Sequence, residues 1–321
     1  MKVAAAFTTV YLAWGATYFF IRLSVEHIPP MLVGAIRYVL AGLLLLMWCL
    51  FTRERIFSWR AIRPAVVSGL LLLLGGNGLL IWAEQYVPSS LAAILLSSGP
   101  IWFVVLDRGK WRENFRSKPT IAGLIVGTIG VLLLFGERVM SETGERAGKA
   151  GNTEMVALAV LVVAAISWTA GSLYSKYKAA GNANSVNAGW QMMAAGIAFV
   201  VCSLISGEWG HFRPHEVPLS SWMSIGYLVT FGSLIGYSAY TWLLQVRPAT
   251  QVSTHAYVNP VVAVLLGVIF AGERLGWLQV VGLMVILASV LLINLAKYRQ
   301  EARLRGNKWG SKGVLVPTDT L

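Results

Sequence analysis

The chain alternates between long apolar stretches and short polar connections. Ten apolar stretches can be marked, at residues 4–22, 31–52, 61–83, 90–108, 119–136, 155–177, 186–206, 220–244, 250–271 and 276–296. A helix of about 20 residues crosses the ~30 Å hydrocarbon layer of a bilayer. Because the apolar residues run continuously and do not alternate with polar ones, helices are predicted and the strands of a barrel are not. The pattern predicts an all-α polytopic membrane protein with ten transmembrane helices.

The composition agrees with this prediction. Of the 321 residues, 56% are hydrophobic and only 12% are charged, whereas soluble domains carry about 25% charged residues. A soluble enzyme, a disordered chain and a fibrous repeat are therefore poor fits. The two cysteines, Cys49 and Cys202, fall in predicted helices near opposite faces of the bilayer, so no disulfide is expected.

The longest internal connection divides the chain into two halves. Residues 1–136 and 155–298 each hold five predicted helices, and a polar, Gly-rich linker, predicted to be extracytoplasmic, joins them over 137–154. The tail at 299–321 is basic and is predicted to be cytoplasmic and disordered, and its last part, GSKGVLVPTDTL, is left out of the predicted fold. No cofactor is implied.

The basic residues predict an orientation in the membrane. The net charge is +12, from 26 Lys and Arg against 14 Asp and Glu. With the N-terminus in the cytoplasm, 19 of the Lys and Arg fall on the cytoplasmic side and 5 on the other, while Arg22 and Arg37 lie inside helices near the outer face. This excess predicts that both termini are cytoplasmic. The basic tail suits anionic lipid, and no nucleic-acid partner is expected.

The two halves are similar to each other in sequence. A shift of 154 residues or of 160 residues aligns, in chain order, Trp14 with Trp168, Arg22 with Lys176, Trp82 with Trp242, Pro100 with Pro260 and Glu113 with Glu273. Since five crossings is an odd number, the second half enters the membrane from the opposite face. Inverted repeats of this kind usually place the substrate site near the midplane, where the halves meet. A purely structural duplication is the alternative.

Several segments carry a resemblance to a known family. They include AWGATYFFIRLSVEHIPP, GNGLLIWAEQYVPSSLAAILLSSGPIW and AYVNPVVAVLLGVIFAGERL. With these motifs the chain resembles the drug/metabolite transporter (DMT) superfamily, specifically its EamA-type ten-helix exporters, over about residues 7–298. The first half departs from the pattern, with WRENFRSK where a Gly-Glu-Lys-like end is expected. The resemblance implies export of amino acids or similar metabolites through the cell inner membrane, by alternating access.

Aromatic and polar residues inside the predicted helices are candidates for substrate binding, because polar groups in hydrocarbon tend to face a cavity or another helix. Trp14 and Trp168 lie midway along their helices, as walls of a cavity or as packing at the pseudo-symmetry axis. Asn77 lies between glycines, with Tyr237 as its counterpart. The predicted substrate-binding residues are Trp14, Tyr18, Asn77, Ser98, Trp102, Trp168, Tyr237, Tyr240 and Tyr257.

Two prolines and two arginines are predicted to serve gating. Pro100 and Pro260 lie within helices and kink them, as flexing points or as static bends. Arg22 and Arg37 lie near the outer face, where they attract a carboxylate or pair with carbonyls and with Glu26, which is spaced i, i+4 from Arg22.

A proton site has one candidate, His255, which lies within a predicted helix and is either titratable or a packing residue. The acidic residues lie at helix ends or in loops, with Glu84 at the outer end of the third helix. Their placement argues against strong coupling to an ion and leaves facilitated diffusion open.

The sequence holds no HExxH, GxSxG, Walker A or paired CxxC motif. These absences argue against catalysis. The inverted repeat and the family resemblance predict secondary transport of a small-molecule substrate by a monomer or homodimer in the lipid bilayer. The alternatives are a nucleotide-sugar or drug carrier of the same superfamily, a channel, and a membrane-embedded enzyme.

Overall fold

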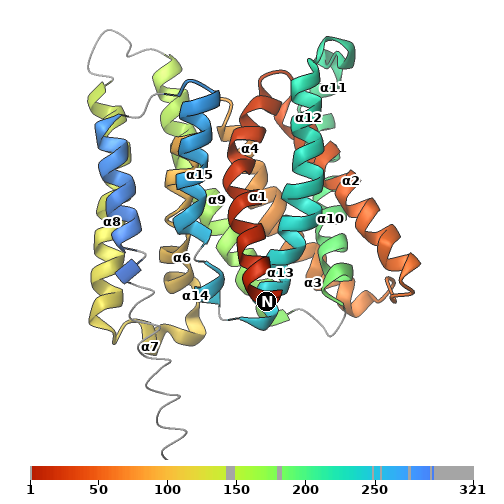
Figure 1. Cartoon of the computed structure of the whole chain (residues 1–321), viewed down its shortest axis with the longest axis horizontal. Helices are drawn as coiled ribbons and strands as arrows, with labels where there is room; N and C mark the ends of the chain where they lie inside the picture. The colour runs from red at the N-terminus through yellow and green to blue at the C-terminus, as the bar shows by residue number, and fades with distance from the viewer. Residues whose placement is uncertain are drawn as a thin grey trace, which may run out of the picture.

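The computed structural model describes residues 2–141, 149–178, 183–247, 249–253, 255–273, 276–289 and 291–292. Within these residues the secondary structure is helical and contains no strand, which confirms the all-α fold (Figure 1). By length and composition, seven of the described helices are able to cross a membrane, and two shorter apolar helices accompany them. The predicted tail at 299–321 lies outside the described residues.

The first half contributes the helices α1 (Lys2–Val25), α2 (Pro30–Phe51), α3 (Trp59–Gly69), α4 (Leu79–Ala83), α5 (Ser89–Leu96), α6 (Gly99–Leu106), α7 (Trp111–Asn114) and α8 (Lys118–Ser141), with the π-helix η1 (Leu70–Gly78) and the 3-10 helix η2 (Arg108–Lys110). The second half contributes α9 (Lys149–Lys178), α10 (Asn184–Ile205), α11 (Glu208–His211), α12 (Leu219–Tyr227), α13 (Ser238–Val246), α14 (Ala249–Val252) and α15 (His255–Phe270), with the 3-10 helix η3 (Pro214–Glu216) and the π-helix η4 (Leu228–Tyr237). A further helix, Trp277–Ser289, follows α15. The described ends of the predicted linker, 137–141 and 149–154, are helical, because α8 and α9 extend beyond the apolar stretches.

Two long helices contain a π-helical segment in their middle. η1 joins α3 to α4, and η4 joins α12 to α13, at positions that the 160-residue shift superposes. π-Helical turns are rare and occur often at functional sites, because the wider turn displaces the side chains that follow. Both segments contain glycines, and both contribute residues to the central cavity described below.

Two other helices are interrupted near the predicted kinks. α5 ends at Leu96 and α6 begins at Gly99, so Pro100 lies in the first turn of a new helix, where its missing N–H costs little. In the second half the interruption separates α14 from α15, and Pro260 lies inside α15. The two prolines are therefore not in matching local structures, contrary to the prediction of symmetric mid-helix kinks.

Of the described helix pairs between the halves, α2 and α10 have the most extensive contact. A Cβ added to Gly42 would lie 2.8 Å from the backbone nitrogen of Met193, and a Cβ added to Gly196 would lie 2.7 Å from that of Val39. The 154-residue shift superposes Gly42 on Gly196 and Val39 on Met193. The two helices therefore touch backbone to backbone through two reciprocal contacts, which is the role of small residues in membrane helix packing.

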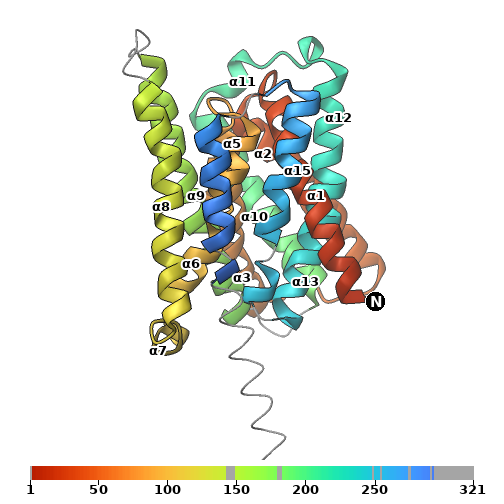
Figure 2. The same ribbon diagram turned by 60° about the vertical axis from the view of Figure 1, so that its left-hand side comes forward.

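The remaining helices pair across the halves in a related way. α1 packs against α15 and against α12, η4 and α13, while α9 packs against α3, η1, α4 and α6. The helix Trp277–Ser289 lies along α8, where the Ser289 hydroxyl donates to the Gly123 carbonyl (2.6 Å). Figures 1 and 2 both show this last pair at one edge of the bundle.

The helices α1 and α9 run in opposite directions. α12, η4 and α13 form one continuous apolar segment. The Ser221 hydroxyl, near the start of this segment, donates to the carbonyl of Leu23 near the end of α1 (2.9 Å). The Lys176 ammonium, near the end of α9, donates to the carbonyl of Leu244 near the end of the same segment (3.0 Å). α1 and α9 therefore end at opposite faces of the bundle.

Candidate substrate cavity

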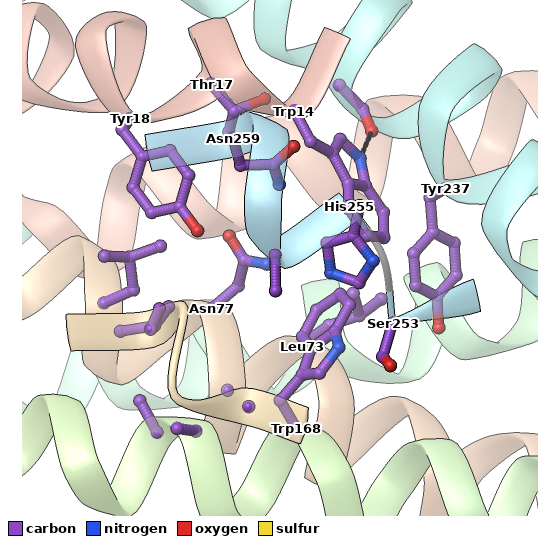
Figure 3. A pocket seen from close by; sticks show the side chains of 18 of the residues that line it. Trp14, Thr17, Tyr18, Leu73, Asn77, Trp168, Tyr237, Ser253, His255 and Asn259 are labelled. Atoms are coloured by element: carbon purple, nitrogen blue, oxygen red, sulfur yellow. Dashed lines mark hydrogen bonds between the residues drawn. The ribbon is translucent and has the colours of Figure 1, made fainter. Parts of the chain in front are cut away.

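A cavity lies where the two halves meet, and α1, α2, η1, α4, α6, α9, η4 and α15 all contribute to its wall (Figure 3). The space open to the centres of water-sized molecules is about 70 Å³, which is room for on the order of five water molecules or one small solute. The lining residues are Trp14, Thr17, Tyr18, Arg37, Tyr38, Leu73, Gly76, Asn77, Leu80, Leu96, Gly99, Pro100, Phe103, Ala164, Ala165, Trp168, Gly232, Tyr237, Ser253, His255, Ala256 and Asn259.

An aromatic cluster forms one side of the cavity. Trp14 and Trp168 meet edge to face with ring centroids 5.3 Å apart, and Tyr240 packs on both rings at 4.7 and 5.5 Å. The Trp14 Nε1–H donates to the Gly232 carbonyl (3.0 Å), and the Trp168 Nε1–H donates to the Tyr240 hydroxyl (3.2 Å). The two tryptophans therefore pack at the interface between the halves and also line the cavity. The sequence did not decide between these two roles.

Glycines in the π-helical segments make room for these tryptophans. A Cβ on Gly76 would lie 3.0 Å from the Trp168 ring, and a Cβ on Gly236 would lie 2.8 Å from Nε1 of Trp14. The 160-residue shift superposes Gly76 on Gly236, so each half supplies the glycine that receives the tryptophan of the other half.

Arg37 supplies a positive charge to the cavity wall. Its side chain is only 2% exposed. The Nε–H donates to the Ser233 hydroxyl (2.9 Å), and Nη1 donates to Oδ1 of Asn77 (3.4 Å). The guanidinium also lies over the Tyr38 ring, 4.8 Å from its centroid. No carboxylate among the described residues forms an ion pair with Arg37 or lines the cavity.

Gln191 occupies the position in the second half that Arg37 has in the first, by the 154-residue shift. The Tyr237 hydroxyl donates to Oε1 of Gln191 (2.9 Å), and Nε2 of Gln191 donates to the hydroxyls of Ser68 and Ser175 (2.8 and 3.1 Å). Since Tyr237 is the counterpart of Asn77, this contact corresponds to Arg37–Asn77 in the other half. Beyond Gln191 lies a second, smaller cavity, whose wall includes Ser68, Ser175 and Asn187.

His255 begins α15 and projects into the aromatic cluster (Figure 3). Its ring meets those of Trp14 and Tyr240 edge to face, at 5.4 and 5.6 Å. Its Nδ1 lies 2.8 Å from the Val252 carbonyl, so Nδ1 carries the proton in this contact and Nε2 is left for the cavity. These contacts describe a packed, hydrogen-bonded histidine.

Two further polar atoms of the cavity residues have no hydrogen-bond partner in the described part of the chain. They are the Tyr38 hydroxyl and Oδ1 of Asn259. Buried polar atoms are normally paired, so these two atoms are available to a ligand.

The structure brings most of the predicted site residues together. Trp14, Tyr18, Asn77, Trp168, Tyr237, Arg37, Pro100 and His255 line the cavity. Tyr240 lies behind it, packed on both tryptophans. Ser98, Trp102 and Pro260 do not line it, and neither Oγ of Ser98 nor Nε1 of Trp102 has a partner among the described residues. The side chain of Tyr257 lies outside the described part.

Arg22 lies away from the cavity. Nη1 of Arg22 donates to the main-chain carbonyl of Glu84, and Nε lies 3.7 Å from Oε1 of Glu26. These contacts agree with the interpretation that Arg22 pairs with a carbonyl and with Glu26. The sequence analysis missed Tyr38, Phe103 and Gln191, of which Gln191 could have been found by applying the 154-residue shift to Arg37.

The fold and the cavity are those of a polytopic membrane transporter. The EamA-like transporter family matches residues 1–136 and 155–295, and the chain belongs to this family. It is 35% identical over 305 residues to the uncharacterized inner membrane transporter YedA of Escherichia coli (strain K12), with 94% of each chain covered. The chain is thus a multi-pass inner membrane protein that transports a small molecule, and it is not an enzyme.

Two more distant relatives have names that include a substrate. The chain is 24% identical to a probable amino-acid metabolite efflux pump of Salmonella typhimurium (strain LT2), with 92% of this chain and 96% of that protein covered. It is 28% identical to an S-adenosylmethionine/S-adenosylhomocysteine transporter of Chlamydia trachomatis, with 89% and 87% covered. A solved crystal structure covers 93% of the chain with a TM-score of 0.63 and 19% identity, which supports the fold alone.

Proposed function

We propose that this transporter exports small amphipathic metabolites that carry a carboxylate, amino acids above all, by alternating access of the central cavity. The observation that carries the proposal is the buried guanidinium of Arg37 in the cavity wall. A buried charge without a counter-ion is costly in a membrane. An anionic group of a solute would supply that counter-ion.

The other cavity groups suit the remainder of such a solute. The carboxylate would accept hydrogen bonds from Arg37 and from the amide N–H of Asn77, and an amino group would donate to Oδ1 of Asn259. An apolar or aromatic side chain would pack on Trp14 and Trp168. The names of the amino-acid metabolite efflux pump and the S-adenosylmethionine transporter support this class, because both solutes contain an amino-acid carboxylate.

Alternating access rests on the proposal that the halves are inverted repeats. Equivalent residues make equivalent contacts at opposite ends of the bundle. Arg22 donates to the carbonyl of Glu84 and Lys176 donates to the carbonyl of Leu244, and the two shifts superpose these pairs. The contacts Arg37–Asn77 and Gln191–Tyr237 are related in the same way, and we assign them as the two gates of the cavity.

The distribution of Lys and Arg supports an orientation with both termini in the cytoplasm. The end of α1 that carries Arg22 then faces the exterior, and the end of α9 that carries Lys176 faces the cytoplasm. The Gln191–Tyr237 gate, which adjoins Ser175, lies on the cytoplasmic side.

The proposal is tested by counterflow in proteoliposomes with L-phenylalanine, S-adenosylmethionine and phenethylamine, which is phenylalanine without its carboxylate. We expect flux of at least one carboxylate-bearing solute and none of phenethylamine. Arg37→Gln removes charge-assisted hydrogen bonds of about 1.5–3 kcal/mol, so the half-saturating concentration should rise about 10- to 100-fold. Arg213→Gln, an exposed arginine of a loop, is the matched control.

Two further variants test the cavity itself. Asn77→Leu and Trp168→Ala should both reduce flux, because they remove a hydrogen-bonding group and an aromatic wall. Unchanged flux in both, at normal folding, would remove these residues from the site. Transport of phenethylamine equal to that of phenylalanine would refute the role of Arg37.

A further inference from the structure

Among the described residues, Glu84 is the most deeply buried acidic residue, and it does not line the cavity. It directly follows α4 and the apolar segment Ile62–Ala83. Its exposure is 0%, and neither carboxylate oxygen has a hydrogen-bond partner among the described residues. An ionised carboxylate in this state needs a nearby positive charge, and otherwise it takes up a proton.

The charged groups around Glu84 come from three directions. Arg22 of α1 donates to the main-chain carbonyl of Glu84 and not to its carboxylate, and Arg37 of α2 donates to Ser233 and Asn77 through two of its five N–H groups. The Glu273 carboxylate accepts hydrogen bonds from Ser89 and Ser90 at the start of α5. Among the described residues, Tyr18 of α1 also interacts electrostatically with Glu84.

These groups set the acidity of Glu84. Burial, followed by the like charge of Glu273, raises the pKa of Glu84 well above its ordinary value, while Arg22 and Arg37 act to lower it. The charge state of Glu84 therefore depends on whether the positive charge of Arg37 is free or is neutralised by another anion.

We propose that Glu84 is a proton-binding site linked to the occupancy of Arg37. When the cavity is empty, the uncompensated positive charge of Arg37 favours the ionised form of Glu84. When a solute carboxylate binds Arg37, the Glu84 carboxylate takes one proton from water and becomes the neutral acid, and it releases that proton when the solute leaves. The inference rests on the anion-binding role of Arg37 proposed above.

The coupling between proton binding at Glu84 and anion binding at Arg37 makes transport depend on pH. Because binding of a proton and binding of the anion favour each other equally, solute affinity should fall as the pH rises through the pKa of Glu84, by up to about tenfold per pH unit. The proton and the solute cross together, so an acidic exterior opposes export. Net export then follows the outward gradient of the solute.

The proton site is tested first without any solute. Infrared titration of the purified protein should show a carboxylic-acid carbonyl band that Glu84→Gln abolishes and that disappears at a pH well above the ordinary glutamate range of about 4.3. In Arg37→Gln the midpoint should rise by about one pH unit or more, while Arg213→Gln should leave it unchanged. No difference band between wild type and Glu84→Gln, or a midpoint unaffected by Arg37→Gln, overturns the proposal.

A second measurement needs no variant. Dicyclohexylcarbodiimide reacts with a protonated carboxyl group, and the O-acylisourea that forms rearranges to a stable N-acylurea. Peptide mass spectrometry should find this adduct on Glu84, in an amount that decreases as the pH rises. Lack of label at Glu84 in acid, with label on another buried acid, would contradict the assignment.

The link to transport is tested with L-phenylalanine and S-adenosylmethionine in proteoliposomes. Wild-type flux should respond to an imposed pH gradient, and Glu84→Gln should retain counterflow while losing that response. A response kept in full by Glu84→Gln refutes the link. If neither solute is transported by the wild type, the proposed substrate class fails, and the infrared titration still decides whether Glu84 binds a proton.

Discussion

The reciprocal glycine contacts between α2 and α10 predict that alanine at either glycine destabilises the protein, and the two variants can be compared with each other. Gly42 and Gly196 are buried, and each lies against the backbone of the facing helix. Because the two contacts are related by the repeat, alanine at either position should have nearly the same effect. A molecule whose halves merely pack together, without this relation, would give two unrelated effects.

The size of the effect follows from the distances. An added Cβ would lie 2.8 Å from the Met193 nitrogen in Gly42→Ala and 2.7 Å from the Val39 nitrogen in Gly196→Ala. An ordinary contact needs about 3.4 Å or more, so the helices must separate by about 0.6 Å. The atoms opposite are backbone and cannot rotate away. Overpacking of this kind costs about 1–3 kcal/mol, and the double variant should cost less than the sum, since one separation relieves both contacts.

The assay is thermal denaturation of the detergent-solubilised protein, followed by size-exclusion chromatography of the fraction that stays monodisperse. We expect the midpoint to fall by a few degrees in each single variant. Gly226→Ala is the control, because Gly226 is an exposed glycine of α12 with no atom within 4 Å of an added Cβ. A single variant as stable as Gly226→Ala, or costs that differ widely between Gly42→Ala and Gly196→Ala, would refute the reasoning.

Three further predictions concern individual contacts. Glu273→Gln should lower the unfolding free energy by about 2 kcal/mol, because the carboxylate binds the start of α5, and thermal denaturation against the exposed Glu216→Gln checks this. Trp14→Phe keeps a ring but loses the bond to the Gly232 carbonyl, so stability should fall by about 1 kcal/mol in the same assay. Tyr237→Phe removes the bond to Gln191, and hydrogen exchange of α13 should quicken about fivefold while that of α8 stays unchanged.

The apolar pattern was sufficient to predict the all-α membrane fold and many of the residues that line the cavity, whereas the count of ten helices stays a prediction. Long apolar stretches have few alternatives in a membrane, so their helical state follows from composition. The internal repeat then marked Trp14 and Trp168 as equivalent, and the structure places their rings in contact. Asn77 was found because an amide between glycines inside an apolar helix is costly unless it faces a cavity or another helix.

Features that depend on packing between helices were not predictable in this way. The π-helical turns of η1 and η4 are wider than an α-helix, and nothing in a local sequence requires that, although the glycines hinted at close approach. α6 begins one residue before Pro100, whereas Pro260 lies inside α15, because tertiary contacts decide where a helix ends. Glu84 was placed correctly at a helix end, but its burial depends on α1 and α2 covering that end.

The two halves share their geometry and differ in their chemistry. Arg37 and Gln191 occupy equivalent positions, and so do Asn77 and Tyr237, yet among the described lining residues a permanent charge lies only at the end that carries Arg37. Under the proposed alternating access, a symmetric scaffold would let the cavity open to either side at similar cost, because each opening would break an equivalent hydrogen bond. The unequal residues explain why a solute would bind in one orientation, with its anionic group toward α2. Shape alone would not distinguish the two ends, so under the proposed function the direction in which a solute lies would come from the charge of Arg37.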